Sequence, residues 1–190
     1  ELALELLNSP VVPGGASWTV HHSVIEKVRE RCGHFASAQH VEFFAMRAAS
    51  TVADRIAEAY FIEGGKAPGE RFKAKPMPRL NPSRKADELM VVANFVEVYL
   101  AKEGHDGVVG INYLEKIQLP NVPSIYGAML AGVDYVLMGA GIPRYIPGIL
   151  DNYAAGRPAE MPIAVLDSNG AKTRFDPRQV CGDEVPQLKR

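Results

Sequence analysis

Two short segments of the sequence carry residue types that could bind a ligand, and the first is residues 110–116 (GINYLEK). This segment places an amide, a carboxylate and an amine within five positions, directly after an apolar run. The amide of Asn112 offers both a hydrogen-bond donor and an acceptor, which suits the edge of a flat heterocycle. An alternative role for Asn112 is to cap the loop that follows.

The second segment, residues 138–143 (MGAGIP), contains two glycines and a proline. Gly139 and Gly141 would let the backbone approach a ligand closely, and Pro143 is expected to start a helix, whose N-terminus can accept an anion. The segment lacks the full GxGxxG spacing, so a tight turn between a strand and a helix is the alternative.

Other polar residues have a competing structural explanation. His105 lies between two acidic residues and could act as a general base, but it precedes a strand, which favours a turn histidine. The basic residues of the loop at 64–82 could hold a phosphate or simply be solvated, and they are Lys66, Arg71, Lys73, Lys75 and Arg79. The remaining histidines and both cysteines lack metal-ligand spacing, and they are His21, His22, His34, His40, Cys32 and Cys181.

The composition indicates a globular protein and argues against several classes of partner. The 190 residues include 47% hydrophobic residues, and 21 basic residues nearly balance 22 acidic ones. The resulting net charge of −1 gives no general attraction to nucleic acid or to an anionic membrane. No stretch reaches the roughly 18 apolar residues of a membrane span, and the cysteine usage suits a reducing cytoplasm. We therefore expect a cytoplasmic protein with a small-molecule substrate.

The first half of the chain is expected to be helical and rich in loops. Helical spacing predicts helices over 23–32 and 41–61, and the proline- and lysine-rich stretch 64–82 predicts a loop. A further helix is expected from a cap at Ser83 to Gly104, with a strand over 95–100 as the alternative.

The second half has the order of a parallel α/β sheet. Buried strands are expected at 106–112 and 134–141, and each is followed by a helix, at 124–132 and 143–156. A last strand is expected at 161–167, before a turn at Ser168-Asn169-Gly170. The predicted organisation is a helical and loop-rich region at 1–82, βα units at 83–170 and an extended linker at 171–190.

Residues 93–151, from ANFVEVYLAKEG through GINYLEKIQLP to GAGIPRYIPGILD, resemble the nitronate monooxygenase (2-nitropropane dioxygenase) family. They are also similar to the FMN-dependent enoyl reductases of polyunsaturated fatty acid and polyketide synthases. The resemblance implies a (βα)8 TIM-type barrel that binds FMN and oxidises alkyl nitronates with oxygen. It implies that Asn112 contacts the flavin, and with the strand-end glycines the expected cofactor-binding set is Asn112, Gly110, Gly139 and Gly141.

The sequence departs from that family in two places. Residues 9–22 do not reproduce its glycine- and methionine-rich first strand, and its glycine-glycine-histidine segment with the proposed catalytic base has no counterpart here. A complete barrel needs about 250 residues. We therefore expect a partial barrel without an assignable catalytic residue, and an open barrel predicts self-association. A non-catalytic remnant or interaction module is the remaining alternative.

Overall fold

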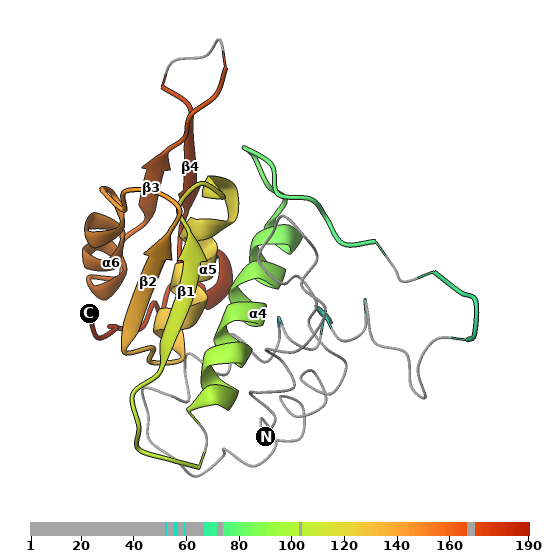
Figure 1. Cartoon of the computed structure of the whole chain (residues 1–190), viewed down its shortest axis with the longest axis horizontal. Coiled ribbons are helices and arrows are strands. Elements are labelled where there is room, and N and C mark those ends of the chain that lie inside the picture. The colour runs from blue at the N-terminus through green and yellow to red at the C-terminus, as the bar shows by residue number, and fades with distance from the viewer. Residues whose placement is uncertain are drawn as a thin grey trace.

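The computed structural model describes residues 52, 55, 56, 59, 67–71, 74–102, 104–166 and 170–190 (Figure 1). The elements in chain order are α4 (Arg84–Ala101), β1 (Gly110–Leu114), α5 (Gln118–Leu130), β2 (Tyr135–Gly139), α6 (Ile146–Ala154), β3 (Ala159–Pro162), β4 (Lys172–Phe175) and α7 (Arg178–Cys181). The helix expected at 23–32 lies outside the described residues. Of the helix expected at 41–61, positions 52, 55, 56 and 59 are described and are helical.

Helix α4 begins where the sequence predicts. The Ser83 hydroxyl accepts a hydrogen bond from the Ala86 backbone N–H at 3.3 Å, which satisfies one of the unpaired donors at the helix start. The helix continues to Ala101, so the alternative of a strand over 95–100 is wrong. Its apolar residues recur at helical spacing and are buried, including Leu89, Val92 and Phe95. The expected loop is confirmed, since 67–71 and 74–80 contain no helix or strand.

Strands β1 and β2 form a parallel pair whose crossover connection contains α5. This confirms the order of strand, helix and parallel strand that the sequence predicts. The expectation that both strands are fully buried is wrong. Exposed residues alternate with less exposed ones along each strand, because α5 covers only one face of the pair.

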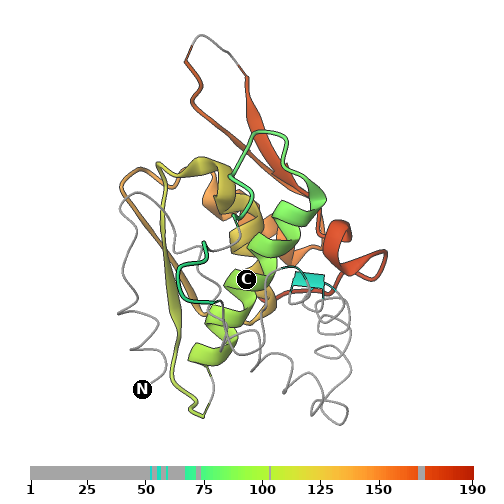
Figure 2. The ribbon, with the colours of Figure 1, turned by 90° about the vertical axis from the view of Figure 1, so that its right-hand side faces the viewer.

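Helix α5 is the central element of the core. Every residue from Pro120 to Met129 is buried, as expected for a helix that is packed on all sides. Figure 2 shows why: α5 lies between the β1–β2 pair and the β3–β4 strands, with α4 alongside. The helix begins at Gln118, six residues before the expected start at 124, and therefore includes two prolines.

The proline inside α5 is accommodated by a distant residue. Pro123 has no N–H to donate to the carbonyl of Leu119, one helical turn earlier. The hydroxyl of Thr173, on β4, lies 3.4 Å from that carbonyl oxygen and donates to it instead. The helix thus keeps its carbonyl partnered even though the local sequence resembles a loop.

The last part of the chain differs from the expected parallel strand and linker. Strand β3 pairs with β4 in antiparallel register, joining Ala159 to Phe175 and Pro162 to Lys172. The expectation of an extended linker at 171–190 is wrong, because this stretch contains β4 and α7. It also buries Phe175 and Cys181 in the main hydrophobic core. The alternation of buried and exposed residues on β4 explains its pairing, since one side of the strand packs on α5.

The described residues therefore form an α/β fold with one parallel strand pair and one antiparallel pair. They do not contain a continuous sheet that joins β2 to β3. Within the same residues, no helix is long and apolar enough to cross a membrane.

A buried carboxyl group in the first turn of α4 predicts a pH-dependent stability. Asp87 is 5% exposed, and no hydrogen bond or ion pair between described residues reaches its carboxyl group. Burial raises the pKa of Asp87 from 3.8 to about 6. Because the folded state binds this proton more tightly than the unfolded state, the free energy of unfolding should fall as the pH rises from about 4 to about 6.

We expect Asp87→Asn to remove this fall in the free energy of unfolding with rising pH. At pH 7 the variant should be more stable than the unchanged protein by about 2 kcal/mol, and at pH 4 the two should be nearly equal. Urea unfolding at both pH values measures the difference. Carboxylates whose pKa is lowered, such as Asp134 beside Lys102, contribute equally to both proteins and cancel. A stability difference that is the same at both pH values would contradict the prediction.

Candidate functional site

One face of the β1–β2 pair is open. Because Gly110 pairs with Tyr135, Asn112 with Leu137 and Leu114 with Gly139, these six residues lie on the same face. We call them the open face. Tyr135 is 61% exposed and Leu137 is 53% exposed, so this face presents two large side chains to the solvent.

The opposite face of the strand pair packs on α5. Tyr113 is buried there, and its hydroxyl lies 2.8 Å from Asn94 Oδ1 and 3.1 Å from the Ser124 carbonyl oxygen. Burial, together with the nearby charge of Glu97, raises the pKa of Tyr113, so this phenol stays protonated and donates its hydrogen bond. The network fixes the orientation of β1 between α4 and α5.

Asn112 lies in the middle of the open face. It is exposed, and no hydrogen bond between described residues involves its side-chain amide. The expected position at a strand end is wrong, because β1 continues for two residues to Leu114. The alternative that Asn112 caps the following loop is also not found, since its amide has no partner in that loop. An unpartnered amide on an exposed strand is available to a ligand.

The carboxyl ends of the two strands meet at Glu115 and Gly141. The Glu115 backbone N–H donates to the Gly139 carbonyl oxygen at 2.8 Å, which extends the strand pairing by one residue. The Glu115 side chain then lies directly against Gly141, where a Cβ atom would be 2.6 Å from Glu115 Cβ. Between the glycines, Ala140 has a φ of +57°, a conformation that costs energy for a residue with a side chain. Gly141 is therefore required for close packing at this edge.

Two side chains that the sequence pattern does not single out, those of Gln118 and Asn121, complete this edge. The Gln118 side-chain amide donates to Glu115 Oε1 at 3.2 Å, and its oxygen accepts the Ala164 N–H at 2.9 Å. The Asn121 amide donates to the Leu114 carbonyl oxygen at 3.2 Å. The spacing of Glu115 and Gln118 by three residues, directly after a strand, is the one local signal of this arrangement.

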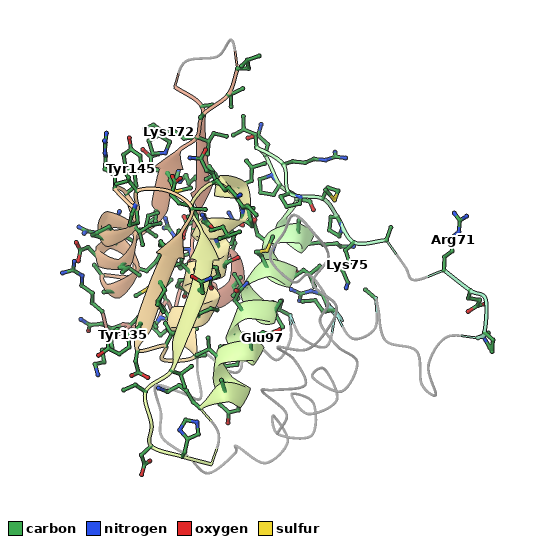
Figure 3. The ribbon with its side chains drawn as sticks, in the orientation of Figure 1. Arg71, Lys75, Glu97, Tyr135, Tyr145 and Lys172 are labelled. Atoms are coloured by element: carbon green, nitrogen blue, oxygen red, sulfur yellow. The ribbon has the colours of Figure 1, made fainter. Side chains whose placement is uncertain are left out.

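Gly110 does not join the other predicted site residues. It lies at the amino end of β1, paired with Tyr135, whereas Gly139 ends β2. Figure 3 shows the two ends: Tyr135 marks one, and Tyr145 and Lys172 mark the other. A Cβ atom at Gly110 would lie 2.9 Å from Leu137 Cδ1, so the glycine makes room for that side chain.

The helix start expected at Pro143 is also different. Helix α6 begins at Ile146, and its cap residue Tyr145 makes no side-chain capping bond. The Ile146 N–H donates to the Pro143 carbonyl oxygen, and Pro147 has no N–H. Two of the donors that would bind an anion at this helix start are thus missing or occupied.

His105 lies in the turn between α4 and β1, and its ring makes hydrogen bonds within that turn. Its Nδ1 accepts the Gly107 N–H at 2.9 Å, and its Nε2 lies 2.7 Å from the Ala101 carbonyl oxygen. Since an acceptor at Nδ1 leaves the proton on Nε2, these bonds describe a neutral imidazole that donates to Ala101. His105 precedes β1, at the end opposite Glu115. The arrangement favours the turn histidine over the general base.

For the other candidate residues that it describes, the structure indicates no catalytic or metal-binding role. The Cys181 thiol is buried, its Sγ lies 3.1 Å from the Tyr126 hydroxyl, and burial raises the pKa of the thiol. Among the described residues no group of three or more His, Cys, Asp or Glu side chains could hold a metal. His21, His22, His34, His40 and Cys32 lie outside the described residues, as do Lys66 and Lys73 of the basic loop.

The geometry defines an α/β protein with an open, mostly apolar sheet face that carries one unpartnered amide and is bordered by a carboxylate. Comparison of the chain with models of protein families, with curated proteins and with solved structures gives no match.

Proposed function

We propose that the chain carries part of an FMN-dependent oxidoreductase of nitronate monooxygenase type, and that the open face binds the flavin. The observation that carries this proposal is the unpartnered amide of Asn112 on an exposed apolar surface. The resemblance of residues 93–151 to the nitronate monooxygenases supports it independently.

The open face fits the chemistry of a flavin ring. Leu114 and Leu137 offer apolar surface to the flat ring, and Asn112 offers a donor and an acceptor to its polar edge. Gly139, without a side chain, leaves the backbone accessible beside Asn112: a Cβ atom there would approach Asn112 Oδ1 at 4.0 Å. These residues would hold one side of the cofactor.

The same proposal explains why the face is open. In a (βα)8 barrel, one face of each strand is turned to the interior and the other to the surrounding helices. The β1–α5–β2–α6 segment has the order of successive βα units. Helix α5 lies on the face opposite Asn112, because Tyr113, the next residue of β1, contacts Ser124 of α5. We infer that the open face is the inner wall of such a barrel, near its carboxyl-end mouth.

FMN bound at the open face would supply the electron acceptor for the substrate, with oxygen as the final acceptor. The residues of this chain would orient the ring and keep water from its face. No described residue is assigned the role of the catalytic base, because His105 is occupied by its turn bonds.

Replacing Asn112 tests the proposed contact. We expect Asn112→Leu to weaken FMN binding about tenfold or more, because both hydrogen bonds to the ring edge are lost while the branching of the side chain is kept. Titration followed by flavin fluorescence measures the dissociation constant. The matched control is Asn152→Leu on α6, which should bind FMN like the unchanged protein. FMN binding that is unaffected by Asn112→Leu would contradict the assignment.

Turnover separates the two enzyme classes that residues 93–151 resemble. With FMN present, consumption of an alkyl nitronate with uptake of oxygen is the expected result. Turnover of an enoyl thioester with reduced nicotinamide would instead favour the enoyl reductases.

A further inference from the structure

We propose that Glu115 belongs to the same binding site and accepts hydrogen bonds from the hydroxyl groups of the ribityl arm of the flavin, with Gln118 as its positioning residue. This inference rests on the proposed function. It assigns the arm of the cofactor to Glu115, the carboxylate of the GINYLEK segment, and to Gln118, which the sequence pattern does not single out.

The first step is the position of Glu115 relative to Asn112. Glu115 directly follows β1 and is fixed at the strand end by its backbone bond to Gly139. Glu115 is three positions beyond Asn112, or about 10 Å along the chain at the usual rise of a strand. The alternation of the strand directs the Glu115 side chain to the side of Tyr113, and its carboxylate lies at the edge of the sheet, against Gly141. A tricyclic ring system that contacts Asn112 and lies along β1 would bring its substituent to that edge.

The second step is the unused bonding capacity of the carboxylate. An ionised carboxylate accepts up to about four hydrogen bonds and donates none. Among the described residues, the Glu115 carboxylate has one side-chain donor, the Gln118 amide, and no ion pair. Its second oxygen, Oε2, lies against the glycine at 141. Hydroxyl groups are the complementary donors, and a carboxylate near a strand end binds the hydroxyls of a ribose in dinucleotide-binding proteins.

The third step is the orientation of Gln118. The Ala164 N–H donates to Gln118 Oε1, which requires the side-chain oxygen to face Ala164 and the NH2 group to face Glu115. The amide therefore cannot rotate without losing both bonds. Gln118 holds the carboxylate at the strand end without needing to touch the ligand, which makes it a positioning residue.

The test compares ligands with and without the ribityl arm. Dissociation constants for FMN, riboflavin and lumiflavin, which has the same ring and a methyl group in place of the arm, are measured by fluorescence titration. The proteins are the unchanged chain, Glu115→Gln, Gln118→Ala and the control Glu160→Gln, whose carboxylate on β3 pairs with Lys172 on β4. Thermal unfolding of each variant shows whether it is folded.

We expect Glu115→Gln to weaken FMN and riboflavin about tenfold and to change lumiflavin less than twofold, because a charged acceptor is lost only for the arm. Gln118→Ala should show the same split with a smaller loss, and Glu160→Gln should show none. A purely structural role would weaken all three ligands equally.

Three results would overturn the inference. Unchanged FMN and riboflavin binding in Glu115→Gln would do so while leaving the proposed function intact. Tighter binding of FMN alone in Glu115→Gln would place the carboxylate beside the phosphate, whose negative charge it repels, instead of beside the hydroxyls. Failure of the unchanged protein to bind any of the three ligands would remove the proposed function, and this inference with it.

Discussion

Replacing Gly127 with alanine should destabilise the protein by more than about 3 kcal/mol, the range typical of severe overpacking in a core. Gly127 is buried where α5 crosses α4. A Cβ atom at this position would lie 2.9 Å from the carbonyl carbon of Val91 and 3.0 Å from its Cα. Both are backbone atoms of a helix, so no side-chain rotation relieves the clash. The two helices would have to separate, which opens the core around Ile125 and Leu89.

Urea unfolding followed by circular dichroism measures this effect, and Gly148→Ala is its matched control. Gly148 lies in α6, and a Cβ atom there meets no atom within 4 Å. Since alanine has the higher helix propensity, this control should be as stable as the unchanged protein or up to about 1 kcal/mol more stable. Equal stability of Gly127→Ala and the unchanged protein would show that the helices do not cross this closely.

Replacing Tyr153 with alanine should cost about 4 kcal/mol, as for other large buried aromatic side chains. Tyr153 is fully buried, and its ring contacts those of Tyr126 and Phe175 at centroid distances of 5.0 and 6.3 Å. Its hydroxyl donates to the Val122 carbonyl oxygen at 2.9 Å. This one side chain therefore joins α6 to α5 and β4, and its loss would release the helix that follows the Gly139–Gly141 turn.

The conservative variant separates the ring from the hydroxyl. Tyr153→Phe keeps the aromatic contacts and should cost only about 1 kcal/mol, the usual value of one hydrogen bond. Both variants are compared with the unchanged protein by urea unfolding. A cost for Tyr153→Ala no larger than that for Tyr153→Phe would contradict the assigned role of the ring.

Several elements could be predicted because their signals are local. Ser83 is followed by apolar residues at helical spacing, which predict α4. Two short apolar runs with glycines predict the parallel strands β1 and β2. The start of α5 could not be predicted in this way. Pro120 and Pro123 suggest a loop, and the helix accommodates Pro123 through Thr173, which lies fifty residues further along the chain.

The pairing of β3 with β4 could not be predicted from the sequence for a related reason. The apolar run at 161–167 suggested a strand of a parallel sheet, but its neighbour β4 has only four residues, two of them basic. The buried members of β4, Thr173 and Phe175, become recognisable only when α5 is known to cover them. Strand pairing is decided by such tertiary contacts more than by local preference.

The candidate site was predictable in part. The sequence drew attention to Asn112 and to the Gly139–Gly141 turn, and the structure places the first on the open face and the second at its edge. Gly110 was grouped with them because it is near Asn112 in the sequence, yet it lies at the other end of the strand. The role of Gln118 cannot be predicted from the local sequence, because its partner Ala164 is 46 residues away.

The most direct test of the central claim is retention of flavin by the chain. The protein is mixed with FMN, passed through gel filtration and examined by its visible absorption spectrum. If the open face around Asn112 binds FMN, the flavin elutes together with the protein. Asn112→Leu then reduces the flavin absorbance of the protein peak. Flavin that elutes entirely apart from folded protein would contradict the account.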